Sequence, residues 1–234
     1  GELGRSFTSG EPVAAVLGHW LVNTLLLMSS GLLLAIVLGT VLGVFMAARR
    51  GGALDIGLTG IGLVLQAAPP FVIGILLLIC FSYGMEFFPS GGMFTPGSDP
   101  GSPWELLTSA DFLHHLILPT LTITALYLVT PMLVMRDSML EVLGSDYVEF
   151  ARAKGLSQNV VILKHVVRNA LIPVVTFLGP ALATLITGSF VIETQFGMTG
   201  IGRLFVESVG RRDYSVIMAL TLIYAFFIAI ANLS

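Results

Sequence analysis

The chain is poor in charged residues. Asp, Glu, Lys and Arg make up 11% of its 234 residues, whereas an ordinary soluble domain carries about 25%. Hydrophobic residues make up 55%, and they gather in uncharged runs that approach or exceed the roughly 20 residues that a helix needs to cross a bilayer. The chain is therefore predicted to be an all-α membrane protein and not a soluble one.

Other shortages exclude further classes of function. A net charge of −3 leaves no basic surface for nucleic acid. The single cysteine, Cys80, cannot form an intrachain disulfide or a thiolate metal cluster. The motifs HExxH and GxSxG are absent, and residues 197–202 lack the Gly-Lys-Ser/Thr ending of a nucleotide-binding loop. We therefore expect no catalytic residue, metal site or nucleic-acid partner in this chain.

The uncharged stretches predict five membrane-spanning segments, approximately at residues 13–48, 56–85, 112–135, 170–192 and 215–234. The first stretch is longer than a simple crossing requires. Residues 12–19 are therefore predicted to form a separate interfacial helix, with Trp20 marking the interface.

The distribution of basic residues predicts the orientation. If the spans alternate in direction, seven basic residues lie on one side of the membrane: Arg49, Arg50, Arg136, Arg152, Lys154, Lys164 and Arg168. Four lie on the other side: Arg5, Arg203, Arg211 and Arg212. The side with the larger number is predicted to be cytoplasmic. The cytoplasmic loop then covers residues 136–169 and the permease domain residues 13–234. Segments 1–12, 86–111 and 193–214 lie outside, and we expect one further span upstream, which gives six.

Two local patterns predict features within the spans. Pro69 and Pro70 interrupt the second span, because an interior proline removes a backbone hydrogen bond and bends a helix. Gly39 and Gly43 have the GxxxG spacing that allows two helices to approach closely. We expect the glycine pair to serve helix packing.

The cytoplasmic loop carries an ordered pattern. Asp146 is predicted to cap a short helix over residues 147–154, with Glu149 completing a capping box. Gly155 stands where a glycine ends a helix, and Ser157 is predicted to begin a second helix. The loop is longer than a connection between two spans needs.

The spacing of the short helix predicts an amphipathic surface. Four residues are expected to share one face: Tyr147, Phe150, Ala151 and Lys154. Together with Ala151, the small residues Ala153 and Gly155 allow close approach of a partner protein. Alternatively, the helix lies on lipid headgroups, with Lys154, Lys164 and Arg168 reaching phosphates. The pattern by itself leaves both interpretations open.

A resemblance distinguishes between them. Residues 149–155, Glu-Phe-Ala-Arg-Ala-Lys-Gly, followed by Asn-Ala-Leu-Ile-Pro at 169–173, resemble the EAA loop of binding-protein-dependent ABC importer permeases. Residues 146–148 and 151–156 resemble the dipeptide and oligopeptide branch. Further similarity occurs at residues 4–6, 193–196, 200–204 and 212–214 and covers nearly the whole chain. Met198-Thr199 departs from the pattern, because many relatives have proline there.

The resemblance implies a type I ABC importer fold in a bacterial or archaeal cell membrane. The implied partners are a second, similar permease subunit, two cytoplasmic ATPase subunits that hold ATP and Mg, an external substrate-binding protein, and a peptide or similar solute. The segment implied to bind the ATPase contains Tyr147, Glu149, Phe150, Ala151, Arg152, Ala153, Lys154 and Gly155. The mixed charge of the loop over residues 193–214 predicts an external partner contact at Arg203, Arg211, Arg212 and Asp213.

Two other functions are weighed against the importer. An ion-coupled secondary transporter or channel also has proline-broken spans, but no acidic residue lies at the middle of any span here. An intramembrane enzyme would use ionisable groups near the spans, such as His114, His115, Asp111 and Glu193. The cargo stays open among dipeptides, longer peptides, nickel chelates and glutathione. Selectivity is expected to lie mainly in the external binding protein.

Overall fold

The computed structural model describes residues 3–98 and 109–231. Helices account for the regular structure in these ranges; the one β-type pairing there is an isolated bridge between Arg5 and Pro12. Part of the predicted outer loop, residues 99–108, lies outside the described residues, as do residues 1–2 of the N-terminal segment and 232–234 of the last predicted span.

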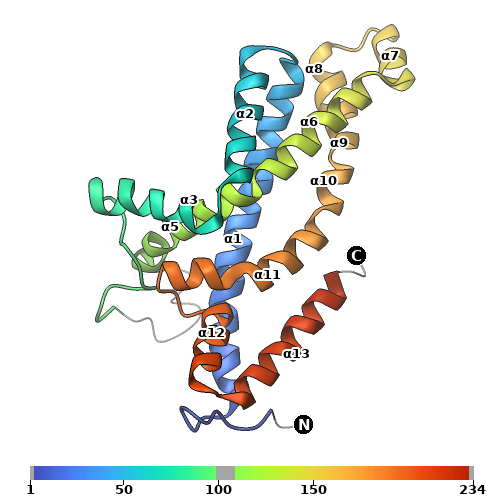
Figure 1. The fold of residues 1–234 in the computed structure, drawn as a ribbon. Helices are drawn as coiled ribbons and strands as arrows, with labels where there is room; N and C mark the ends of the chain where they lie inside the picture. Colours follow the sequence, from blue (N-terminus) through green and yellow to red (C-terminus); the bar gives the residue numbers. More distant parts are fainter. Residues whose placement is uncertain (1–2, 99–108, 232–234) are drawn as a thin grey trace. The chain divides into compact units, whose positions relative to one another are not determined.

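The helices follow the labels of Figure 1. In chain order they are α1 (Val13–Ala48), α2 (Ala53–Ala67), α3 (Pro70–Leu77), the π-helix η1 (Leu78–Gly84), α5 (Ala110–Tyr127), α6 (Val129–Leu143), α7 (Asp146–Ala153), α8 (Gln158–Val160), the π-helix η2 (Val161–Val166), α9 (Val167–Ala170), α10 (Ile172–Thr176), α11 (Leu178–Gln195), α12 (Ile201–Arg211) and α13 (Tyr214–Ala231).

Helix α1 is a single unbroken helix of 36 residues. At 1.5 Å per residue it is about 54 Å long, which exceeds the roughly 30 Å of a bilayer's hydrocarbon core. Because the helix runs from Val13 to Ala48 without a break, the prediction that residues 12–19 form a separate interfacial helix is wrong. Pro12 precedes the helix, and residues 13–20 contain no proline that would interrupt it.

Among the described helices, α1 is the one that is by itself long and apolar enough to span a membrane. Two bent pairs, α2 with α3–η1 and α5 with α6, also qualify if each pair is taken as one span. The break in the first pair falls at the predicted prolines. Helix α2 ends at Ala67, and Pro70 opens α3, where its missing N–H costs no helical hydrogen bond. The number of spans stays a prediction.

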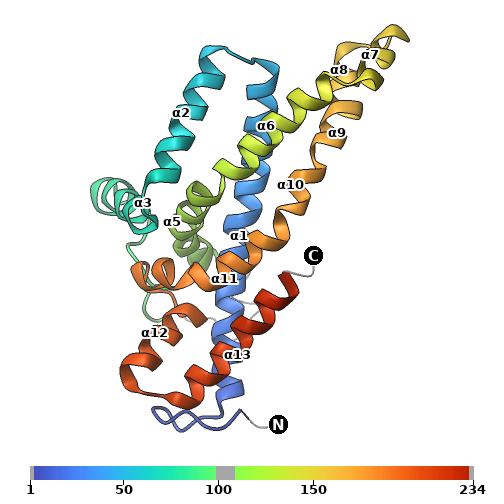
Figure 2. The same cartoon turned by 45° about the vertical axis from the view of Figure 1, so that its right-hand side comes forward.

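The first compact unit contains the described parts of Gly1–Gly31, Pro69–Ile123 and Gly179–Ser234. One of its cores joins three helices: Val13 and Leu17 of α1 pack with Ile201 of α12 and with Val216 and Leu220 of α13. In both ribbon views α12 and α13 are joined by a tight turn (Figure 2). This turn contains Arg212 and Asp213, which belong to the predicted external contact.

The second unit contains Leu32–Ala68 and Thr124–Leu178. Its α1 segment packs closely on α6 through Gly39 and Gly43. A Cβ atom added at Gly39 would lie 2.8 Å from the carbonyl oxygen of Leu128, and one added at Gly43 would lie 2.5 Å from that of Met132. The predicted packing role of the GxxxG pair is confirmed.

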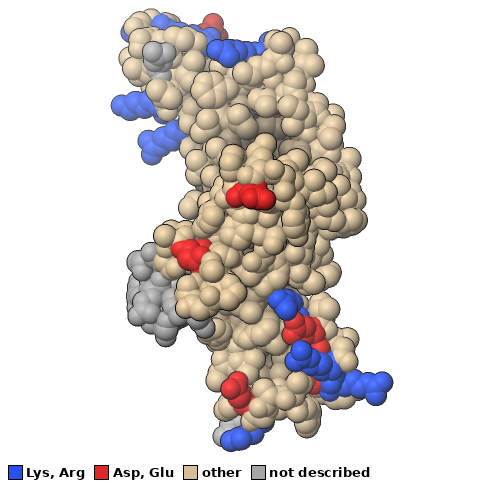
Figure 3. Space-filling view, turned by 90° about the vertical axis from the view of Figure 1, so that its left-hand side faces the viewer, with Lys and Arg blue, Asp and Glu red and all other residues tan. Residues whose placement is uncertain are grey.

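Large apolar side chains remain exposed on several helices. Leu33 of α1, Val64 of α2 and Phe226 of α13 each expose more than 60% of their surface. One face of the molecule is mostly uncharged (Figure 3). Exposure of this kind suits a chain whose solvent is lipid, because lipid tails are as apolar as these side chains.

Candidate functional site: the helix α7 and its surroundings

The predicted cytoplasmic helix is present. Helix α7, Asp146–Ala153, follows α6 after two residues and precedes α8, η2 and α9, which run back beside α6 (Figures 1 and 2). The segment is therefore a helical hairpin that carries one short helix at its tip.

The predicted N-terminal cap of α7 is wrong by one residue. Ser145 has the extended backbone of an N-cap, and Asp146 is already helical. The hydroxyl of Ser145 donates to the carbonyl oxygen of Val142 and makes no capping hydrogen bond to α7. The proposed capping box of Asp146 and Glu149 does not form, because Ser145 competes for the cap position and serine is an equally good N-cap residue.

The predicted C-terminal end is confirmed. Gly155 has φ +78°, the left-handed conformation that favours glycine, and its N–H donates to the carbonyl oxygen of Arg152. No atom lies within 4 Å of a Cβ added at Gly155, so a larger residue there is opposed by backbone strain alone. Ser157 occupies the N-cap position of α8, as predicted.

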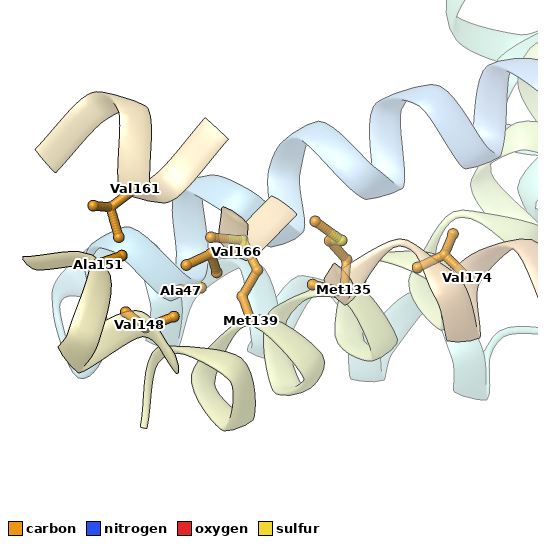
Figure 4. Close-up of a cluster of buried hydrophobic side chains, with 9 residues drawn as sticks. Ala47, Met135, Met139, Val148, Ala151, Val161, Val166 and Val174 are labelled. Atoms are coloured by element: carbon orange, nitrogen blue, oxygen red, sulfur yellow. The ribbon is translucent and has the colours of Figure 1, made fainter. Parts of the chain in front are cut away.

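The inner face of α7 packs against its own chain (Figure 4). Val148 is fully buried and Ala151 is 6% exposed, and both belong to a cluster with Met139 of α6 and with Val161 and Val166 of η2. Sequence reasoning missed Val148. It also placed Ala151 beside Phe150 on a partner-facing surface, which is wrong, because Ala151 faces the chain's own core.

The outer face of α7 is exposed. Phe150 exposes 61% of its surface and Tyr147 exposes 40%. The ammonium of Lys154 lies 4.4 Å from the centre of the Phe150 ring, a cation–π contact. The remaining residues of the predicted coupling segment are also exposed: Glu149, Arg152, Ala153 and Gly155.

Tyr147 fixes α7 to the returning helices. Its hydroxyl donates to the carbonyl oxygen of His165 at 3.1 Å and accepts from the side-chain amide of Asn169 at 2.7 Å. The inner face and this contact hold the helix by its two sides. The exposed ring of Phe150 is therefore presented on a helix whose position is set by its own chain.

Sequence reasoning also missed an ion pair between α2 and α6, in the same compact unit as α7. Arg136 of α6 donates from Nε to Oδ1 of Asp55 at 2.6 Å and from Nη2 to Oδ2 at 2.9 Å. Asp55 lies in the first turn of α2 and is 3% exposed. The two residues are 81 positions apart, so spacing gives no signal for the contact.

The predicted external residues have separate roles. Arg203 Nε donates to Glu207 at 2.7 Å, and Arg211 lies 3.8 Å from the other oxygen of Glu207, so both are held within α12. Arg212 is exposed and has the left-handed φ of +58°. Asp213 is 2% exposed and accepts hydrogen bonds from Ser6 and Thr8, so its side chain serves an internal contact. Contact of the three arginines with an external partner stays a prediction.

The groups considered for an intramembrane enzyme make local contacts. Glu193 is fully buried and accepts from the Thr24 hydroxyl at 2.6 Å and from the Arg203 N–H at 2.8 Å, so it holds the first turn of α12. His114 and His115 form hydrogen bonds with the carbonyl oxygens of Phe87 and Asp111. Each of these three side chains therefore has a structural contact within the chain.

The environment of Asp213 predicts an effect of pH. Burial by itself would raise the pKa of Asp213, but hydrogen bonds from Ser6 and from the backbone of Phe7, Thr8 and Val216 lower it below its ordinary value of 3.8. A lowered pKa stabilises the folded contact above pH 3.8, and this stabilisation is lost as the pH falls through the folded pKa.

We therefore expect the Thr8 amide to lose protection from hydrogen exchange below about pH 3.8. The measurement compares protection factors, corrected for intrinsic rates, with those of the Ile217 amide, which donates to a backbone carbonyl. Protection of Thr8 that does not fall relative to that of Ile217 at any pH below 3.8, down to the pH at which the chain unfolds, would contradict this role of Asp213.

Comparisons with known proteins agree with this architecture. The family model described as binding-protein-dependent transport system inner membrane component matches residues 39–234. The chain is 38% identical to the oligopeptide transport system permease protein AppB of Bacillus subtilis over 234 residues, covering all of this chain and 72% of that protein. It is 34% identical to the oligopeptide transport system permease protein OppB of Escherichia coli, covering 92% of this chain and 62% of that one.

A solved structure supports the fold. The crystal structure of an amino acid ABC transporter with histidines matches with a TM-score of 0.56 and 19% identity, covering 94% of this chain and 91% of that one. The predicted type I importer fold is confirmed, and the ion-coupled transporter or channel is set aside. The chain belongs to the family of binding-protein-dependent transport system inner membrane components, the inner-membrane permease subunits of ATP-driven ABC importers.

Proposed function

We propose that this chain forms half of a translocation path for peptides and that the exposed face of α7 is its contact with a cytoplasmic ATPase. The observation that carries the proposal is the two-sided construction of α7. Val148 and Ala151 hold it to the chain's own core, while Phe150 projects outward with 61% of its surface exposed. Aromatic residues are common anchors of protein interfaces, and a fixed anchor loses little conformational freedom on binding.

The same construction supports a mechanism. The inner face of α7 contacts α6 through Met139 and the returning helix through Val161 and Val166. A displacement of α7 by its partner is therefore passed to α6 and η2 through packed side chains, which resist compression. The two states of the transporter then differ in how the ATPases bind α7, so ATP binding shifts the equilibrium between them.

The proposed assembly contains this chain, a second permease subunit, two ATPase subunits that bind ATP and Mg²⁺, and an external substrate-binding protein. In this assembly the chain has no catalytic residue. The names of the relatives support peptides as the cargo. Binding of dipeptides and longer peptides by the external protein, measured by calorimetry, tests the cargo; exclusive binding of a metal chelate would contradict it.

Replacing Phe150 with aspartate tests the ATPase contact. We expect the ATPase to bind about thirtyfold more weakly, because loss of an interface anchor costs about 2 kcal/mol and each 1.4 kcal/mol is tenfold. Affinity is measured with the assembled permease pair in nanodiscs. A matched control is Val206→Asp on α12, which places the same carboxylate at a residue that is 46% exposed outside this segment. Unchanged affinity for Phe150→Asp would favour lipid headgroups as the occupant of this face and overturn the proposal.

A further inference from the structure

The ion pair of Asp55 and Arg136 lies inside the second compact unit, between α2 and α6. Both carboxylate oxygens accept from the same guanidinium, at 2.6 and 2.9 Å, which is the two-point geometry that fixes distance and orientation together. Asp55 also accepts from the N–H of Gly51 at 2.9 Å. The carboxylate thus joins three elements: the turn after α1, the start of α2 and the middle of α6.

The neighbouring contacts between these helices are apolar. A Cβ added at Gly62 of α2 would meet Met132 at 3.1 Å, and Met132 clusters with Met46 and Val129. Apolar contacts are non-directional, so by themselves they do not fix the position of α6 along α2. The two-point ion pair does fix it, because a shift of α6 would leave the buried carboxylate of Asp55 without the guanidinium of Arg136.

The position of Arg136 connects this contact to α7. Arg136 follows Met135 and precedes Met139 by three residues on α6, and both methionines are buried in the cluster that holds Val148 and Ala151 of α7. Helix α6 is therefore attached to α2 by the ion pair and to α7 by the methionines, within about one helical turn.

We propose that Asp55 and Arg136 are positioning residues for energy coupling. They hold α6 against α2, so that a displacement of α7 moves the membrane-spanning helices and is not absorbed by sliding of α6. This inference rests on the proposed function, in which α7 receives its displacement from an ATPase. It adds a requirement: assembly with the ATPase and transport by it depend on different residues.

The test measures peptide transported per ATP hydrolysed in proteoliposomes, together with ATPase affinity. For Asp55→Asn we expect the ratio to fall roughly two- to thirtyfold, the range for residues along a coupling network, with ATPase affinity retained. The matched control is Asp137→Asn. The carboxylate of Asp137 also accepts from Arg136, at 2.7 Å, but it is 69% exposed and lies on α6 itself, so its loss leaves the link to α2 intact.

A second variant covers the case in which Asp55→Asn fails to fold. Arg136→Lys keeps the charge and one hydrogen bond but loses the two-point geometry, and we expect an intermediate ratio. The double variant Asp55→Asn with Arg136→Gln should be no worse than the poorer single variant, since both changes remove one interaction.

Three outcomes would overturn the inference. The first is a normal ratio of peptide transported to ATP hydrolysed for folded Asp55→Asn or Arg136→Lys, and the second is an equal fall of this ratio for Asp137→Asn. The third is a fall of the ratio that is accounted for by weaker binding of the ATPase. Failure of the proposed function is distinguishable, because it would abolish ATPase binding by the unmodified chain or leave Phe150→Asp unaffected.

Discussion

Replacing Gly43 with leucine is expected to lower the free energy of unfolding by about 3 kcal/mol, the upper part of the range for overpacked sites. Its Cβ alone would lie 2.5 Å from the carbonyl oxygen of Met132 and 2.8 Å from the Cβ of Met135. Both neighbours belong to the rigid part of α6, so the clash cannot be relieved by a side-chain rotation. The helices α1 and α6 must separate, and their separation removes the apolar contacts that the glycine allowed.

The measurement is denaturant unfolding in detergent micelles, followed by helical circular dichroism. Gly60→Leu is the matched control, because Gly60 is also in a helix and no atom lies within 4 Å of its added Cβ. There leucine is expected to be neutral or slightly stabilising, since it is the better helix former. Equal stability of the two variants would show that the close approach of α1 and α6 is not required.

The same glycine shows how far sequence patterns predict this fold. The GxxxG spacing predicts close packing of a helix because the signal is contained within four residues of one chain segment. It does not predict that the partner is α6, because that choice depends on how the chain folds back. Pro69–Pro70 is a similar case: the missing N–H predicts a break, and the helix ends at Ala67.

The candidate site was predicted less completely. The ends of α7 and α8 at Gly155 and Ser157 follow from local backbone chemistry. The buried face does not, because the helix has two apolar stripes that share Ala151. One continues to Phe150 and Tyr147, and the other to Val148; only contact with Val161 and Val166 decides between them.

Two buried carboxylates show the limit of spacing arguments. In the sequence, Asp55 and Asp213 stand near other charged residues at the ends of apolar segments, and nothing there indicates that they are buried. Their burial depends on Arg136, 81 residues away, and on Ser6, 207 residues away. No periodicity connects such partners, so residues that fix the position of α6 and of the N-terminal segment escaped prediction.

Replacing Val148 with aspartate is expected to abolish uptake while the chain stays inserted in the membrane. Val148 is fully buried among Met139, Val161 and Val166, which offer no partner for a carboxylate. Burying an unpaired charge costs several kcal/mol, about 3 to 5 by comparison with broken buried ion pairs. This exceeds what one short helix gains by packing, so α7 leaves the cluster.

Hydrogen exchange separates this outcome from loss of a partner contact. In Val148→Asp the amides of Glu149 and Lys154, which donate to Ser145 and Phe150, should lose protection because a detached eight-residue helix is unstable in water. In Phe150→Asp the same amides should stay protected while ATPase affinity falls. The two variants carry the same new side chain, two residues apart on one helix, and they differ in which face receives it. Native-like protection in Val148→Asp would mean that the inner face does not hold α7, and transmission through the cluster would then be wrong.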